Sequence, residues 1–162
     1  MIQAMQDFLI NLFGNQLSIF AIAMVPVLEL RAAIPIGISM GFDWVTVFII
    51  SVLGNMLPIP FIIAFLRPIF EWMKKTKLFA PIVHKLEGRA KKKADSIAGY
   101  LKWGLFIFVA VPLPGTGAWT GALIASFLDM RFKDCIFPIF MGVVTAGAVV
   151  TALSMGVLKM FF

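Results

Sequence analysis

Apolar residues dominate this chain, and polar residues gather at a few interruptions and in one long central segment. Two stretches, 44–66 and 135–158, are long enough as apolar helices to cross the hydrocarbon core of a bilayer. Shorter apolar runs reach only about half of that thickness; they lie at 17–25, 30–40, 103–111 and 118–128. The pattern therefore predicts two membrane-spanning helices and two pairs of short helices.

A break inside apolar sequence joins the members of each short pair. The first break contains Pro26 and leads into Glu29 and Arg31, and the second, residues 111–117, reads VPLPGTG. Proline and glycine free backbone groups that lipid cannot satisfy, so each break must be buried in protein or line a watery cavity. Ionisable residues this deep in apolar sequence are costly and mark functional positions by default. We expect each pair to form a re-entrant hairpin.

The two halves of the chain show a weak internal repeat. A shift of 86 residues places Pro26 on Pro112 and Asp43 on Asp129. Ten of the fourteen Lys and Arg residues lie within 67–102, a segment that the positive-inside rule places in the cytoplasm. Tracing the spans from there puts Asp43 outside and Asp129 inside, so the halves are predicted to be inverted. Their hairpin tips would meet near the midplane, where transporters built from inverted repeats bind substrate.

The predicted architecture is an all-α integral membrane protein with a single membrane domain, 1–162. An amphipathic interfacial helix, 1–16, comes first. Two inverted half-repeats, 17–66 and 103–162, each hold a re-entrant hairpin and a transmembrane helix. A cytoplasmic basic amphipathic connector, 67–102, joins them. A rival interpretation treats 8–28 and 103–128 as ordinary spans. It leaves 29–43 as a loop that is too apolar for water.

Composition narrows the function classes. The chain is 61% hydrophobic, with a mean hydropathy of +1.00, and no soluble fold of 162 residues has interior enough for that. One cysteine and one histidine predict no metal site and no cofactor. The net charge of +6 belongs to the connector and does not indicate nucleic-acid binding. The first residues carry no Lys or Arg, so no cleavable signal peptide is expected.

The two breaks hold the candidate chemistry. Arg31 has the bidentate fork that suits a phosphate or carboxylate, and a carboxyl group at Glu29, withdrawn from water, suits reversible proton carriage. In an unwound segment both would point into one cavity. Opposite them, the turn before Ala118 would expose backbone N–H groups to an anion. The other substrate-binding candidates are Pro114, Gly115, Thr116, Gly117, Trp119, Thr120 and Asn55, the last on a polar face of the first span turned toward protein.

Plainer interpretations of the same residues remain open. Glu29 and Arg31 would neutralise each other and lock the first hairpin. The prolines and glycines of the second break would serve only a tight turn, and Trp119 would pack instead of stacking on a ligand.

The residues 29–35, ELRAAIP, and 112–121, PLPGTGAWTG, resemble the two hallmark motifs of the bacterial and archaeal small multidrug export protein family. More distantly, the layout is similar to the DedA/VTT superfamily. That second likeness implies opposed re-entrant hairpins and proton-coupled translocation of lipid phosphates, with Glu29 at an acidic hairpin position and Arg31 at a substrate-phosphate position. The second break departs from the DedA pattern because residues 111–129 contain no arginine.

The sequence thus favours a small proton-coupled secondary transporter, and not an enzyme, in a prokaryotic cytoplasmic membrane. Its partners would be membrane lipids, an anionic amphiphile such as a lipid phosphate, and a second copy packed through the small-residue face of 142–156. An exporter of cationic amphiphiles is the alternative. A membrane enzyme lacks a nucleophile and base, since His84 lies far from both breaks, and a lipid-organising protein without turnover is the last possibility.

Overall fold

The structure is a computed structural model that describes residues 15–75, 100–113 and 115–161. All regular structure in these ranges is helical. The labelled helices are α2 (Asn15–Met24), α3 (Glu29–Ser39), α4 (Trp44–Met56), α5 (Pro58–Lys75), α7 (Ala118–Phe127) and α8 (Phe132–Phe161). One more helix, Tyr100–Ala110, precedes the second break. Residues 1–14 of the predicted interfacial helix and 76–99 of the connector lie outside the described residues, whereas Asn15 and Gln16 belong to α2.

Two helical stretches of the described chain are long and apolar enough to cross a bilayer, Trp44–Ile69 and Phe132–Gly156, each with a mean hydropathy of 2.2. This confirms that both predicted spans form long apolar helices. The first is interrupted at Leu57, between α4 and α5, because Pro58 and Pro60 have no N–H to donate to the preceding turn. Helix α5 continues to Lys75, so it runs without a break from the first span into the first residues of the predicted connector.

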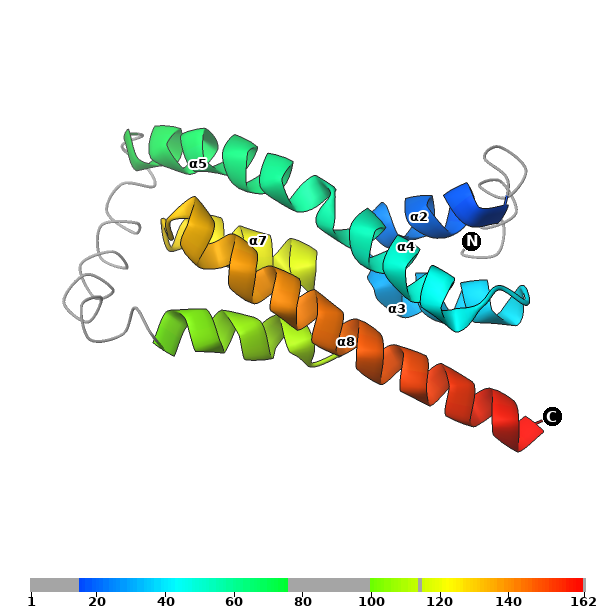
Figure 1. The fold of residues 1–162 in the computed structure, drawn as a ribbon. Coiled ribbons are helices and arrows are strands. Elements are labelled where there is room, and N and C mark those ends of the chain that lie inside the picture. The colour runs from blue at the N-terminus through cyan, green and yellow to red at the C-terminus, as the bar shows by residue number, and fades with distance from the viewer. Residues whose placement is uncertain (1–14, 76–99, 114, 162) are drawn as a thin grey trace.

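The first pair of short helices forms a hairpin that packs on α4 (Figure 1). Its turn is closed by the backbone N–H groups of Leu28 and Glu29, which both donate to the carbonyl of Val25, at 3.1 and 2.9 Å. Gly54 lets α4 approach α2 closely, since a Cβ there would lie 2.5 Å from the carbonyl oxygen of Phe20. The predicted short runs 17–25 and 30–40 therefore appear as α2 and α3.

The second hairpin consists of the helix Tyr100–Ala110 and α7, joined by residues 111–117. Glycine again permits close approach: a Cβ at Gly121 or at Gly142 of α8 would lie 2.7 Å from the side chain of Val109. The order of short helix, turn, short helix and long helix thus occurs twice in the described chain.

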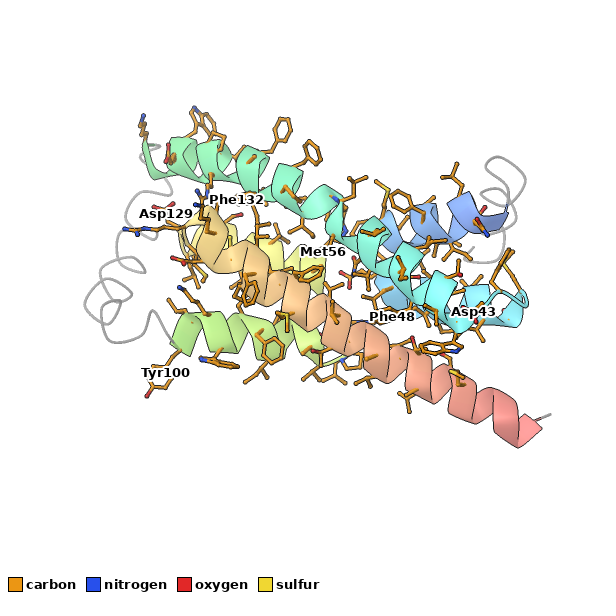
Figure 2. The ribbon with its side chains drawn as sticks, in the orientation of Figure 1. Asp43, Phe48, Met56, Tyr100, Asp129 and Phe132 are labelled. Carbon is orange, nitrogen blue, oxygen red and sulfur yellow. The ribbon has the colours of Figure 1, made fainter. Side chains whose placement is uncertain are left out.

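Each hairpin also packs against the long helix of the other half. Helix α3 packs on α8, and α7 packs on α5 (Figure 1). A single hydrophobic core runs through both halves and includes Ile22, Ile34, Val109 and Ile139. Asp43 and Asp129, the equivalent turn residues, lie at opposite ends of the molecule (Figure 2). The two hairpins therefore enter the core from opposite ends and bring their turns together between them.

The small-residue face of α8 is largely used inside the chain. Gly142 faces Val109, Ala146 is 3% exposed, and a Cβ at Gly147 would lie 2.9 Å from the ring of Phe48. Of the face predicted to bind a second copy, Ala148, Ala152 and Gly156 stay exposed.

Candidate functional site

The turn of the second hairpin wraps around the first turn of α3. Glu29, the first residue of α3, is only 5% exposed, and its Oε1 accepts a hydrogen bond from the backbone N–H of Trp119 at 3.4 Å. The N–H of Ala118 also donates to this carboxylate. A negative charge here is stabilised by the positive end of the α7 dipole. The helix N-terminus that the sequence offered to a substrate anion is therefore taken by Glu29 of the same chain.

The backbone at this contact is unusual on both sides. Gly117 has φ 140° and ψ −172°, a combination that only glycine adopts readily. A Cβ at this position would lie 2.7 Å from the carboxyl carbon of Glu29. Glu29 has a left-handed φ of 49°, which costs an L-residue roughly 1–2 kcal/mol. Strain of this kind gathers at functional sites, so the Glu29–Gly117 contact is the most distinctive feature of the interface.

Arg31 also joins the two hairpins, through hydrogen bonds to the second turn. One terminal nitrogen donates to the carbonyl of Leu113, and the other donates to the carbonyl of Thr116 and, at 2.9 Å, to its Oγ1. The Thr116 hydroxyl also donates within its own turn, to Val111 O at 2.7 Å. The second turn therefore presents its carbonyls to the guanidinium of Arg31.

Trp119 completes the contact between the hairpins. Its indole N–H donates to the carbonyl of Met24 at 3.1 Å. We call these cross-hairpin bonds of Glu29, Arg31 and Trp119 the interlock. No ion pair joins Glu29 to Arg31 among the described residues. Each of these charged side chains instead forms hydrogen bonds with the second hairpin. The expectation of an unwound segment was wrong, since both side chains belong to the first turn of α3.

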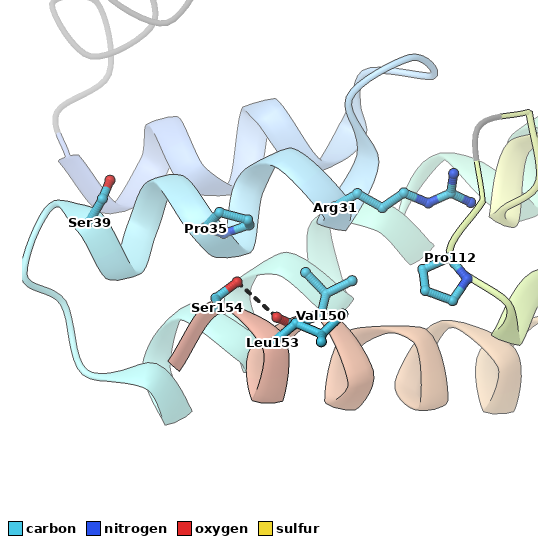
Figure 3. Close-up of a pocket in the computed structure, with 7 residues that line it drawn as sticks. All are labelled: Arg31, Pro35, Ser39, Pro112, Val150, Leu153 and Ser154. Atoms are coloured by element: carbon cyan, nitrogen blue, oxygen red, sulfur yellow. Dashed lines mark hydrogen bonds between the residues drawn. The ribbon is translucent and has the colours of Figure 1, made fainter. Parts of the chain in front are cut away.

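A groove of about 420 Å³ opens between α3 and α8 on one side of the interlock. Arg31 lies at one end of this Arg31 groove, next to Pro112, and Ser39 lies at the other end (Figure 3). The wall is mostly apolar, and the hydroxyl of Ser154 is satisfied by Val150 O at 2.8 Å. Arg31 is the one charged residue that lines this groove. A cationic end and an apolar wall suit an amphiphile with an anionic head.

A second groove, of about 590 Å³, lies between α5 and α7 and has no charged residue in its lining. Phe61, Phe65 and Leu66 form its α5 side, and Trp119 and Leu123 form its α7 side. The substrate-binding candidates Arg31 and Trp119 therefore line different grooves. We call this one the Trp119 groove. Both grooves run between the second short helix of one hairpin and the long helix of the other half.

Asn55 lies beside Glu29 and in neither groove. Together with Glu29, Gly117 and Val143 it lines a narrow space that leaves no room for a water molecule in this state. Asn55 is 1% exposed, which confirms that its polar face turns toward protein, and neither atom of its carboxamide has a hydrogen-bond partner.

The remaining predicted site residues contribute less. Thr120 lines neither groove nor the space around Asn55, and Gly115 serves the turn with φ 86°. Pro114 lies outside the described residues. The described chain contains no group of three or more His, Cys, Asp or Glu side chains suited to a metal ion. Sequence reasoning missed the carbonyls of Met24 and Leu113, because a main-chain acceptor has no side-chain signature.

A family model described as "Putative small multi-drug export protein" matches residues 29–149. No curated protein and no solved structure matches the chain. The matched range begins at Glu29, includes Arg31, and takes in the whole second break, so it contains the interlock apart from Met24. With its two apolar spans, this membrane protein belongs to the putative small multi-drug export protein family, whose name gives it a role in membrane transport.

Proposed function

We propose that this protein is a small secondary transporter that moves an amphiphile with an anionic head group, a lipid phosphate being the preferred class. The observation that carries the proposal is that Arg31 belongs both to a groove and to the contact between the hairpins. Its guanidinium closes the inner end of an apolar groove and at the same time holds the carbonyls of the opposite turn. A substrate that binds Arg31 must therefore affect the contact between the hairpins.

The energetics favour an anion as the group that releases this contact. Charge-assisted bonds from arginine to a phosphate are stronger than its bonds to neutral carbonyls, and they are bidentate. A phosphate arriving at Arg31 replaces Leu113 and Thr116 as its partner and so releases the Arg31 contact with the second turn. Binding then stabilises the open arrangement over the closed one, as any ligand-driven change requires.

The layout of the two grooves fits alternating access. If the connector is cytoplasmic, the Asp43 end faces outward and the Asp129 end faces inward. The Arg31 groove extends from the interlock to Ser39, toward the Asp43 end of the molecule. The Trp119 groove extends along α5 to Leu66, toward the end where the connector begins. The hairpins would then be re-entrant and inverted, with one half-path open to each side and the interlock between them. Glu29 is the proposed proton carrier at that barrier.

Export of cationic amphiphiles is the alternative that the family description favours. It would use Glu29 as the counter-charge and Trp119 as a stacking face. Against it, neither groove is lined by Asp or Glu, and the carboxylate of Glu29 is enclosed within the interlock. An anionic head group therefore suits the grooves better.

Reconstituted vesicles test the proposal. A fluorescent short-chain lipid phosphate and a quaternary ammonium dye are followed in parallel under a pH gradient, with wild type, Arg31→Ala and the exposed control Arg131→Ala. We expect Arg31→Ala alone to lose lipid-phosphate flux. Full lipid-phosphate transport by Arg31→Ala refutes the assignment, and selective dye transport supports the alternative. Chemical change of the lipid would instead indicate an enzyme, and absence of flux in wild type a lipid-organising role.

Labelling of single cysteines tests the inverted topology. Asp43→Cys and Asp129→Cys are introduced separately into a Cys135→Ala background, since Cys135 is buried. A membrane-impermeant maleimide should label position 43 from outside and position 129 from inside the cell. Labelling of both positions from one side excludes inverted halves.

We also propose that the protein works as a homodimer, with the exposed Ala148, Ala152 and Gly156 as the contact between copies. Ala152→Cys should form a disulfide-linked dimer in native membranes, and a matched cysteine at exposed Phe65 should not. A fully active monomer in mild detergent contradicts this.

A further inference from the structure

The buried carboxamide of Asn55 needs a physical explanation. An amide enclosed without hydrogen bonds costs roughly 1–3 kcal/mol, and such groups in folded proteins call for a reason. Asn55 and Glu29 line the same narrow space, and that space does not admit a water molecule in this state. Asn55 therefore faces Glu29 with an acceptor oxygen and a donor nitrogen, both without a partner.

The hydrogen-bond chemistry of Glu29 changes when it binds a proton. An ionised carboxylate only accepts hydrogen bonds, and Ala118 and Trp119 supply backbone N–H donors to it. A protonated carboxyl group carries an O–H that must be donated to an acceptor. The N–H groups at the start of α7 cannot accept it, whereas Oδ1 of Asn55 can.

We propose that Asn55 is the positioning residue that receives the protonated side chain of Glu29. On protonation, the carboxyl group exchanges its bonds to α7 for a bond to α4, and the Glu29 half of the interlock opens. Of the charged residues on the helices around this space, α3 supplies Arg31, while the lining residues of α4, α7 and α8 carry no charge. Arg31 keeps its own bonds to Leu113 and Thr116 when Glu29 leaves.

The inference deepens the proposed transport function and rests on it for its purpose. The interlock contains two charged contacts, which are released separately: a proton releases Glu29, and an anionic head group releases Arg31. Neither alone parts the hairpins, so a proton and a substrate must be present together. This is the condition for coupled transport without a proton leak.

The indole of Trp119 reports on the interlock without any substrate. The chain has four tryptophans, so protein labelled with 5-fluorotryptophan gives four ¹⁹F resonances, and Trp119→Phe assigns the one of interest. We expect this resonance to shift with pH in detergent micelles as Glu29 gains its proton. Glu29→Gln should abolish the titration.

Two variants of α4 separate the role of Asn55 from simple packing. Asn55→Leu keeps the volume and removes the acceptor, so the midpoint of the titration should fall by about one pH unit, a tenfold weaker proton affinity. Asn55→Thr, which restores an oxygen acceptor, should recover part of the shift. Ser51→Ala is the matched control, because Ser51 is another buried unpartnered residue of α4 but does not line this space, and its midpoint should equal that of wild type.

Three outcomes overturn the inference: no titration in wild type, an unchanged midpoint in Asn55→Leu, or an equal fall in Ser51→Ala. A response of the Trp119 resonance to sodium at constant pH would also overturn it, since the site would then take a metal cation. Because the experiment contains no substrate, loss of lipid-phosphate flux in vesicles and loss of this titration are separate results.

Discussion

Replacing Gly117 by alanine tests the contact on which the interlock depends. The backbone angles at this position, φ 140° and ψ −172°, cost a residue with a side chain about 1–3 kcal/mol. The new methyl group would also meet the carboxyl carbon of Glu29 at 2.7 Å, so the carboxylate must withdraw from α7. Loss of a hydrogen bond to a charged group adds about 1.5–3 kcal/mol. The variant should therefore lose about 3–5 kcal/mol of unfolding free energy.

Thermal unfolding in detergent micelles measures this loss, with an expected fall in Tm of roughly 10 °C. Gly115→Ala is the matched control: its φ is also positive, at 86°, but a Cβ there has nothing within 4 Å, so it should lose only the backbone share. Adding Glu29→Ala to Gly117→Ala removes the clash, and the two changes should couple by more than about 1 kcal/mol. Equal losses in Gly117→Ala and Gly115→Ala would refute the reasoning.

Three further changes probe other contacts by the same unfolding measurement. Thr116→Val removes the hydroxyl that accepts from Arg31 at 2.9 Å and should cost about 1–2 kcal/mol; Thr145→Val, whose hydroxyl bonds within its own helix at Met141 O, should cost less. Gly54→Ala forces a methyl group to 2.5 Å from the carbonyl of Phe20 and should cost about 1–3 kcal/mol. Gly104→Ala is the control, because a Cβ there has nothing within 4 Å, and it should not destabilise the protein. Asp134→Asn breaks the 2.7 Å ion pair with Lys102. Because both side chains are substantially exposed, the loss of unfolding free energy should stay below about 1 kcal/mol. A larger loss would mean that this ion pair anchors the structure.

The lengths of apolar runs predicted most of the helices. The run 118–128 became Ala118–Phe127, and the run 30–40 became Glu29–Ser39, each within two residues. This works because proline, glycine and aspartate end a helix by local chemistry. The sequence was less informative around residues 66–75: Pro68 does not end α5, and nothing local to the sequence shows that Arg67 donates to the carbonyl of Met130.

The pairing of site residues was less predictable. Glu29 and Arg31 stand out in the sequence as charges in an apolar run, but their partners are backbone groups more than 80 residues away. The groove that Trp119 faces depends on α7 packing against α5 and not on its own sequence. A stripe of small residues permits close contact equally well within a chain and between chains, so the use of Gly142 and Gly147 inside the protomer follows only from the tertiary structure.

The packing of each hairpin on the opposite half sets the order in which this protein can be completed. Helix α3 leaves the ribosome long before α8, and Arg31 precedes its acceptor at Leu113 by 82 residues. The first half therefore enters the membrane with two charges that have no lasting partner. The bonds of Glu29 and Arg31 can form only after the second break is translated, and α3 gains its neighbour in the other half only with α8. A nascent chain truncated before Phe132 should therefore stay vulnerable to quality-control proteases.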